Sequence, residues 1–391
     1  MAETYPPLAF EFSTAGRIIF GAGKLRELGK IAQDLGKCAL VVTGIPDDKT
    51  SGVVDQLESR GLGCTLYKIM GEPTVDVVNQ CVALAGEEEC DLFCGLGGGS
   101  AIDTAKATAI LLANGGGIED YLEVIGKGKT LTNPSMPCIA IPTTAGTGAE
   151  VTRNAVIGSP EHRVKVSLRS PLMLPCIALV DSELTYGLPA ELTASTGLDA
   201  LTQLIEPYVS VRRNPITDSL CETGMRYSAR SLRTVYRDGD VPTAREDLSL
   251  ASLLSGLALA NASLGVVHGF ASVLGGMYSG PHGAICARLL PLVMAMNIKA
   301  IMKRSPGSEF LSQYEKIAKV ITGREDAMAD DGVAWVENLC SDLQIPPLSR
   351  YGVKWDDLPG IVEKSSRASS TKGNPIQLTE EEMHLILEKA I

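Results

Sequence analysis

The stretch "DLFCGLGGGSAIDTAK" (residues 91–106) governs the expected fold, because three glycines join an apolar run of strand length to a helical pattern. Ser100 and Asp103 have the spacing of a capping box, so we expect Ser100 to open the helix. Glycines let a ligand approach the backbone, and free N–H groups at a helix start favour an anion such as a pyrophosphate. The stretch is not the GxGxxG fingerprint, so a phosphate cradle and a simple tight turn are equally good interpretations of it alone.

The first half of the chain alternates apolar runs with helical patterns. Near-continuous apolar runs of strand length lie at residues 38–43, 64–69, 91–97 and 138–144. Helical spacing lies between them at residues 50–61, 73–89 and 101–113. This alternation is typical of a parallel sheet covered on both faces. A hairpin with Ser159 and Pro160 in its turn is expected to follow over residues 154–168.

A second polar loop favours a cofactor site over a simple turn. The stretch "IPTTAGTGAEVT" (141–152) leaves another apolar strand and delivers Thr143, Thr144 and Thr147 around two glycines. Ligands of open α/β sheets bind at the carboxyl edge of the strands, where both loops should lie. Two glycine-rich loops at one edge therefore predict a dinucleotide.

After about residue 185 helical patterns dominate and strand-like segments nearly vanish. The boundary is expected near residues 181–189, which gives an α/β domain over residues 1–185 and an all-helical domain over residues 186–391. The last helix should begin with Thr379 as its N-cap, because Glu382 completes a capping box three residues later.

Composition excludes several classes of function. A formal net charge of −11 and the lack of a Lys/Arg run argue against nucleic acid or an anionic membrane as a partner. The apolar run at 250–267 contains three serines and an asparagine, so it is expected to be one buried core helix rather than a membrane span. Ten cysteines without a CxxC pair, and an N-terminus without a secretory signal, indicate reduced thiols in a cytoplasmic protein.

Polar side chains interrupt the apolar pattern of the helix expected at 196–210. Asp199 and Gln203 lie four residues apart and should stack one turn above the other, which a buried hydrogen-bonded pair would explain. His268 and His282 lie in similarly apolar surroundings. Two imidazoles and a carboxylate form a common ligand set for Zn²⁺ or Fe²⁺, with a position left open for substrate. No role is expected for the other two histidines, His162 and His384.

The chain resembles the iron-containing (group III) alcohol dehydrogenases, whose superfamily includes glycerol dehydrogenase, maleylacetate reductase and dehydroquinate synthase. The resemblance covers nearly the whole chain and is carried by "FGAGKL" (20–25), "DLFCGLGGGSAIDTAKA" (91–107), "IPTTAGTGAEVT" (141–152), "ALVDSELTYGLP" (178–189), "TGLDALTQLIEPYVS" (196–210), "VHGFASVLGGMYSGPHG" (267–283) and "KGNPIQLTEEEM" (372–383). It implies a dehydroquinate synthase-like fold with a Rossmann-like parallel sheet, an all-α C-terminal domain and an active site in the cleft between them.

The resemblance also implies two sets of site residues. The cofactor, NAD or NADP, would be bound by residues matching Gly97, Gly98, Gly99, Ser100, Asp103, Thr143, Thr144, Thr147 and Lys165. A divalent metal, Fe²⁺ or Zn²⁺, would be held by residues matching Asp199, Gln203, His268 and His282. The resemblance assigns no catalytic residue beyond these metal ligands.

Three positions depart from the family pattern. Gln203 stands where the alcohol dehydrogenases usually have a histidine, and an amide oxygen is a poorer ligand than imidazole for these metals. Ser272 stands where many relatives have a further histidine. Gly44 follows the first strand where NAD-preferring relatives place an acidic residue, so NADP meets no repulsion there, although Asp47 or Asp48 could restore a preference for NAD.

The expected function is reversible, metal-assisted hydride transfer between a small alcohol and NAD(P), giving an aldehyde or ketone. One alternative is a metal-independent reductase similar to maleylacetate reductase, in which the polar cluster binds substrate directly. A lyase resembling dehydroquinate synthase and a binding protein that lost its chemistry are the others. Family members are often dimers or larger, so a homodimer or larger homo-oligomer is expected.

Overall fold

Within the part of the chain that the structure describes, six parallel strands form the main sheet, in the order β1-β8-β5-β4-β2-β3. The computed structural model describes residues 9–162 and 164–391. The strands are β1 (Arg17–Phe20), β2 (Cys38–Thr43), β3 (Gly63–Lys68), β4 (Leu92–Gly97), β5 (Cys138–Pro142) and β8 (Ile177–Val180). The predicted parallel α/β sheet is confirmed, because every neighbouring pair of these strands is parallel. The sequence pattern missed the four-residue strands β1 and β8.

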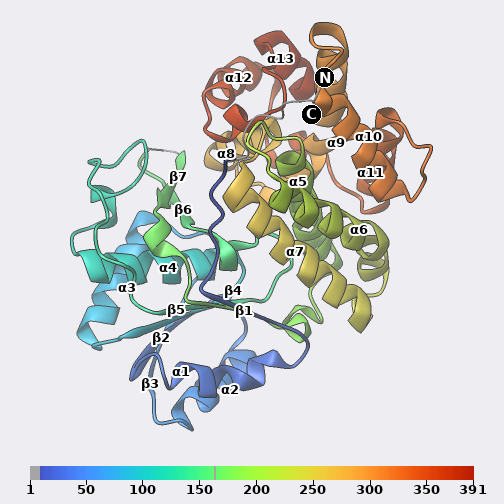
Figure 1. Cartoon of the computed structure of the whole chain (residues 1–391). Coiled ribbons are helices and arrows are strands. Elements are labelled where there is room, and N and C mark those ends of the chain that lie inside the picture. The colour runs from blue at the N-terminus through green and yellow to red at the C-terminus, as the bar shows by residue number, and fades with distance from the viewer. Residues whose placement is uncertain (1–8, 163) are drawn as a thin grey trace.

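Helices cover both faces of the sheet, as Figure 1 shows. One face carries α1 (Leu28–Ala32) and α2 (Asp47–Glu58), and the other carries α3 (Val75–Glu87) and α4 (Gly99–Asn114). The inner strands β2, β4, β5 and β8 are buried almost throughout, which explains their continuous apolar sequence. The edge strand β3 has only exposed and half-buried residues.

An antiparallel hairpin follows the fifth strand. It consists of β6 (Asn154–Ser159) and β7 (Val164–Arg169), which confirms the predicted hairpin. Pro160 lies in its turn as predicted, whereas Ser159 is the last residue of β6 and pairs with Val164. The hairpin packs beside α4, and β7 also contacts α8 of the helical part. It therefore bridges the sheet and the helices that follow.

The remainder of the chain is helical and gathers on one side of the sheet (Figure 1). Its helices are α5 (Ala190–Tyr208), α6 (Pro215–Arg237), α7 (Pro242–Ala262), α8 (Val266–Met277), α9 (His282–Arg304), α10 (Glu309–Thr322), α11 (Ala329–Asp342), α12 (Leu358–Ser366) and α13 (Glu380–Ala390). Short 3₁₀ turns lie at Lys24–Glu27, Ile118–Asp120, Ala149–Val151, Pro171–Met173, Ser182–Thr185, Leu348–Tyr351, Trp355–Asp357 and Ser370–Gly373. The predicted capping box of α13 is confirmed, because Thr379 and Glu382 exchange side chain to backbone hydrogen bonds.

The apolar run at 250–267 is not one helix, so that prediction is wrong. The helix α7 ends at Ala262, Ser263 has a φ of 71°, and α8 starts at Val266 after a bend of 99°. A left-handed residue cannot continue a right-handed helix, so the backbone and not the apolar pattern ends α7. The bend places His268 in the first turn of α8. The helix α9 has the length and hydropathy of a membrane span, but 72% of its apolar window is buried inside the protein, as in a core helix.

The sheet has a topological switch point between β2 and β4. The chain moves outward from β2 to β3, then returns past β2 to form β4. At the carboxyl ends of this pair, the Gly44 N–H donates to the Leu96 carbonyl at 3.3 Å, and a Cβ on Gly97 would lie 3.4 Å from the Gly44 nitrogen. Ligands of open α/β sheets bind in such a crevice. Residues 97–99, here called the glycine turn, border it.

We expect Gly256→Ala to destabilise the protein, because α7 passes very close to the loop after β5. A Cβ on Gly256 would lie 2.4 Å from the Gly148 carbonyl oxygen and 2.7 Å from the Gly148 Cα. Relieving this overlap should cost about 1–3 kcal/mol of unfolding free energy, measured by urea denaturation.

The matched control is Gly52→Ala in α2, where a Cβ meets nothing within 4 Å. This variant should gain about 0.5–1 kcal/mol from helix propensity. Equal stability changes in the two variants would contradict the close approach.

Candidate functional site

The glycine turn opens α4 earlier than the sequence pattern indicates. Gly98 is the N-cap in an extended conformation, and α4 begins at Gly99. The prediction of Ser100 as N-cap is therefore wrong. The extended Gly98 takes that position, so Ser100 already lies inside the first turn of α4. The N–H groups of Gly99 and Ser100 have no acceptor among the described residues, whereas that of Ala101 donates to the Gly98 carbonyl at 3.1 Å. The free N–H groups lie at the switch point of the sheet.

The two predicted cofactor loops meet at the carboxyl edge of the sheet. A Cβ on Gly98 would lie 3.4 Å from Thr144 Oγ1, and one on Gly99 would lie 3.1 Å from Thr147 Oγ1. The strands that deliver them, β4 and β5, are hydrogen-bonded neighbours. The expectation that these loops share one edge is confirmed.

Asp103 makes its contacts inside the protein. Its Oδ2 accepts from the Val156 N–H at 2.9 Å, and its Oδ1 lies 2.9 Å from the Lys106 ammonium, which is completely buried. Lys106 also donates to Ala149 O, Thr152 Oγ1 and Asn154 O. This buried cation ties α4 to β6 and to the loop at residues 143–152, here called the threonine loop. A contact of Asp103 with pyrophosphate stays a prediction.

Lys165 lies between the hairpin and the helical part. Its ammonium group is 2.5 Å from the Glu72 carboxylate, and its side chain is only 13% exposed. A Cβ on Gly275 of α8 would lie 2.8 Å from Lys165 Nζ. The chain thus places this lysine against the helix that carries His268.

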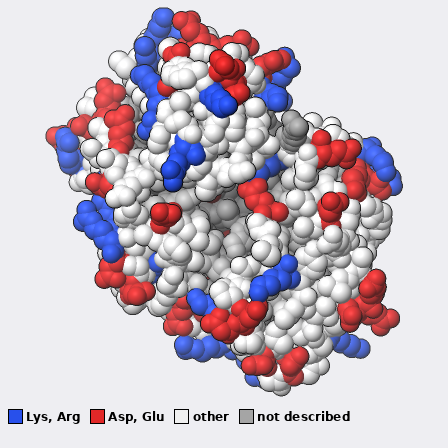
Figure 2. Space-filling view, turned by 180° about the vertical axis from the view of Figure 1, so that it is seen from behind, with Lys and Arg blue, Asp and Glu red and all other residues white. Residues whose placement is uncertain are grey.

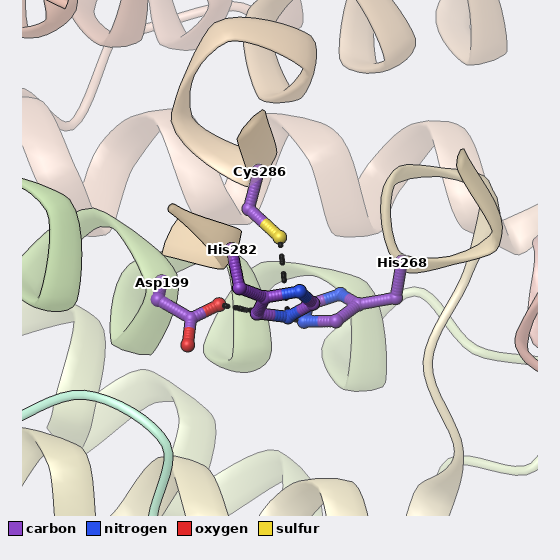
Figure 3. Close-up of side chains that lie close together, drawn as sticks. All are labelled: Asp199, His268, His282 and Cys286. Carbon is purple, nitrogen blue, oxygen red and sulfur yellow. Dashed lines mark hydrogen bonds and ion pairs between the residues drawn. The ribbon is translucent and has the colours of Figure 1, made fainter. Parts of the chain in front are cut away.

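Three helices bring four ligand-type side chains together (Figure 3). Asp199 comes from α5, His268 from α8, and His282 and Cys286 from α9. Asp199 Oδ1 lies 3.5 Å from the His268 Nε2 and 3.7 Å from the His282 Nε2. All four ligand atoms lie within 4.8 Å of one another.

Two atoms of this cluster lack hydrogen-bond partners among the described residues. They are Asp199 Oδ1 and His268 Nε2, on side chains that are 3% and 6% exposed. Burying an unpaired carboxylate oxygen is costly, so such groups in proteins are paired or bind metals. A divalent cation at the point these atoms face satisfies both, and carboxylate and imidazole are ligands that Fe²⁺ and Zn²⁺ accept. The residues present therefore fit the metal.

Glu206 orients the ring of His268. The Nδ1 of His268 donates to Glu206 Oε2 at 2.6 Å, and Oε1 accepts from the Val267 N–H at 2.7 Å. A carboxylate on one ring nitrogen fixes the tautomer, so the lone pair of Nε2 faces the cluster. Burial disfavours the charged ring, but without a metal the Cys286 thiol and the carboxylates around the ring outweigh burial and raise the pKa of His268 well above its usual value. A metal would therefore bind Nε2 by displacing the proton on that nitrogen.

Gln203 holds Asp199 in place. Its Nε2 donates to Asp199 Oδ2 at 3.0 Å, and its Oε1 accepts from the Ser255 hydroxyl at 3.0 Å. That hydroxyl is 3.5 Å from the Gly146 carbonyl oxygen of the threonine loop. The chain of contacts links the cluster to the predicted cofactor loop, while a ligand role for Gln203 stays a prediction. Ser272, one turn beyond His268, donates to the Gly269 carbonyl.

Sequence reasoning missed Cys286 and Glu206. Both had a signal in their spacing, because Cys286 follows His282 by four residues on one helix, and Glu206 follows Asp199 by seven. The prediction of reduced thiols is confirmed, because all ten cysteines are free, but it does not distinguish Cys286 from the other nine.

The cluster opens to solvent beside His282. The His282 side chain is 36% exposed, whereas those of Asp199 and His268 are almost fully enclosed. Figure 2 shows one face of the molecule hollowed near its centre and lined there mainly by uncharged atoms. Partial exposure at one ligand leaves a side from which a small molecule can approach.

Two family profiles match almost the entire chain. The profile for "Iron-containing alcohol dehydrogenase" matches residues 15–182, and that for "Fe-containing alcohol dehydrogenase family, C-terminal" matches residues 193–391. The chain belongs to the iron-containing alcohol dehydrogenase family. It is accordingly an NAD(P)-dependent alcohol dehydrogenase, an oxidoreductase acting on CH–OH groups, in a family that uses a divalent metal.

Relatives of this dehydrogenase match it over nearly their whole length. "Alcohol dehydrogenase 4" of Saccharomyces cerevisiae (strain YJM789) is 36% identical over 98% of this chain and 97% of the relative. "1,3-propanediol dehydrogenase" of Klebsiella pneumoniae is 35% identical over 97% of this chain and 98% of the relative. A crystal structure of 1,3-propanediol oxidoreductase, 33% identical, superposes with a TM-score of 0.91 over 98% of this chain and 100% of the other. The crystal structure of sulfoacetaldehyde reductase from Bifidobacterium kashiwanohense in complex with NAD⁺ is 26% identical and superposes with a TM-score of 0.87, over 98% of this chain and 99% of the other.

We expect the free energy of unfolding to fall as the pH rises from about 4.5 to about 7, because of Glu150 in the threonine loop. Burial raises the pKa of Glu150 from its usual 4.5 to about 7. Between these values the folded state keeps a proton that the unfolded state releases, so folding is favoured at the acidic end and loses about 3 kcal/mol across the window. Urea denaturation at several pH values measures this slope.

The control variant is Glu150→Gln, which keeps the shape and cannot titrate. Its stability should fall less than that of the wild type over the same window. Parallel curves for the two proteins would show that Glu150 does not carry the effect.

Proposed function

We propose that this dehydrogenase oxidises small alcohols where the glycine turn and the threonine loop face a metal held by Asp199, His268 and His282. The observation that carries the proposal is the pair of buried, unpartnered ligand atoms, Asp199 Oδ1 and His268 Nε2. The Gln203 and Ser255 contacts that lead from Asp199 to the threonine loop support a shared site. A bound divalent cation supplies Lewis acidity, which favours the alkoxide form of an alcohol and polarises the carbonyl of an aldehyde or ketone.

The surrounding residues prepare the site for this chemistry. Asp199 contributes a negative charge, and Gln203 holds its second oxygen so that the first stays directed at the cluster. Glu206 keeps the proton of His268 on Nδ1, away from the metal side of the ring. Apolar burial of α5, α8 and α9 keeps water from the hydride path, and His282 lines the way in.

The cofactor lies along the carboxyl edge of the sheet in this proposal. Free N–H groups at the start of α4 bind the pyrophosphate, and hydroxyls of the threonine loop line the site. The cofactor-binding residues are Gly97, Gly98, Gly99, Ser100, Asp103, Thr143, Thr144, Thr147 and Lys165. Gln203 is a weak fourth metal ligand or a residue that positions Asp199.

The remaining parts of the proposal concern the whole protein. The chain divides into a nucleotide-binding domain over residues 1–185 and a metal and substrate domain over residues 186–391. Relatives named as alcohol and 1,3-propanediol dehydrogenases support a small alcohol as substrate. The ten free cysteines support a location in the reducing cytoplasm. The protein functions as a homodimer or larger homo-oligomer.

His268→Ala should abolish stoichiometric metal binding and lower kcat/KM for alcohol oxidation by at least about 100-fold, because it removes an imidazole and leaves Glu206 unpaired. Metal analysis after gel filtration and NAD(P)-linked activity, before and after chelation and return of Fe²⁺ or Zn²⁺, measure both effects. The control is His384→Ala on α13, whose partly exposed ring pairs with Glu388. Full metal content and activity in His268→Ala would refute the site, and activity indifferent to chelation would favour the metal-independent reductase.

Gly44→Asp should shift the cofactor preference toward NAD. The position follows β2, and a Cβ there would meet only the Ile69 side chain at 3.6 Å and its carbonyl oxygen at 4.0 Å, so a side chain fits. A carboxylate at this place repels a 2′-phosphate and accepts from a ribose hydroxyl. The ratio of kcat/KM for NADP to that for NAD should fall at least about tenfold, with about 1.4 kcal/mol per tenfold.

The matched control is Gly44→Asn, which has the same shape without the charge. Its cofactor ratio should change less than that of Gly44→Asp. An unchanged ratio in both variants would place the adenosine ribose elsewhere.

A further inference from the structure

Among the described residues, Cys286 is the one thiol that lies with the ligand-type atoms of the cluster. It follows His282 by one turn of α9, is completely buried, and has its Sγ 3.6 Å from the His282 Nε2. Figure 3 shows the sulfur directed at the group formed by the carboxylate and the two rings. A buried cysteine is ordinarily an inert core residue, so its contact with His282, within 4.8 Å of the unpartnered Asp199 Oδ1 and His268 Nε2, needs a separate explanation.

The spacing of the cluster matches four ligands around one cation. Bonds of about 2.0–2.1 Å to nitrogen or oxygen and about 2.3 Å to sulfur give tetrahedral edges of about 3.3–3.6 Å. Three edges of the cluster match these lengths: 3.5 Å and 3.7 Å from Asp199 Oδ1 to the imidazoles, and 3.6 Å from the His282 Nε2 to the Cys286 sulfur. The remaining edges are within 4.8 Å, so small side-chain rotations close the set.

Gln203 leaves a position in the ligand set that the thiol can fill. Its carbonyl oxygen accepts from Ser255, and its nitrogen, which cannot bind a cation, faces Asp199. Only two imidazoles and one carboxylate then remain besides the thiol. A thiolate is a stronger and softer ligand than an amide oxygen, and thiolates favour zinc.

We propose that the Cys286 thiolate is the fourth protein ligand of the metal and makes this a zinc-preferring site. The inference rests on the metal site of the proposed function. As the cation binds, the S–H bond breaks, its electron pair goes to the metal and its proton goes to water, with no change of oxidation state. Because four protein ligands complete a tetrahedral zinc site, substrate would enter as a fifth ligand, on the side that the exposed edge of His282 opens.

Cobalt(II) added to the metal-stripped protein is the probe, because thiolate coordination gives it a charge-transfer band in the near ultraviolet in addition to its visible bands. The wild type should show both sets of bands, and Cys286→Ser should keep the visible bands and lose the near-ultraviolet one. Cys221→Ser, a change at an equally buried thiol on α6, should behave as the wild type. Zinc affinity, measured by competition with a chelator, should fall at least about tenfold in Cys286→Ser alone.

X-ray absorption of the zinc-loaded wild type tests the same contact without any variant, and it should show one sulfur at about 2.3 Å. Cobalt bound without a sulfur band, or zinc without a sulfur neighbour, overturns the role of Cys286 and leaves the proposed function standing. A wild type that binds neither cation overturns the metal site itself. A near-ultraviolet band that survives in Cys286→Ser would also overturn the inference.

Discussion

Two buried carboxylates on one helix constrain the rest of the site. Asp199 and Glu206 lie on α5, both nearly inaccessible to water, and the ring of His268 lies between them. One ring nitrogen is bonded to Glu206, and the other faces the unpaired oxygen of Asp199. Buried charge of this kind needs a cation or a proton nearby, which explains the fit of the cluster to a divalent metal. Together with the Cys286 thiol, the two carboxylates raise the pKa of His268 against the effect of burial.

A second buried charge, the Lys106 ammonium, holds together the elements that border the predicted cofactor site. Lys106 lies on α4 just after the glycine turn and bonds to Asp103 and to backbone carbonyls of the threonine loop and β6. The two cofactor loops thus share one buried cation. The threonine loop continues to Gly146 and Gly148, which contact α7, so the sheet edge and the metal cluster form one connected structure.

Much of the fold followed from local patterns, and the errors have physical causes. Fully buried strands such as β4 and β5 are apolar throughout, so they were predicted, whereas the four-residue strands β1 and β8 carry too little pattern. The break after Ala262 was missed because it depends on the backbone of Ser263 and not on hydropathy. The capping box at Ser100 had the right residue types, but Gly98 takes the N-cap position and Asp103 turns to Lys106.

The sequence by itself determined the parallel sheet, the two glycine-rich loops at one edge, and the set of Asp199, His268 and His282, the last through family resemblance. Only the tertiary structure decided that Cys286 and Glu206 join that set. The sequence of an apolar helix does not show whether a buried thiol faces the core or a ligand cluster. The spacing of a carboxylate along a helix likewise does not show which side chain of another helix it contacts. What each side chain faces depends on how α5, α8 and α9 cross, and that crossing is fixed by packing between segments far apart in the chain.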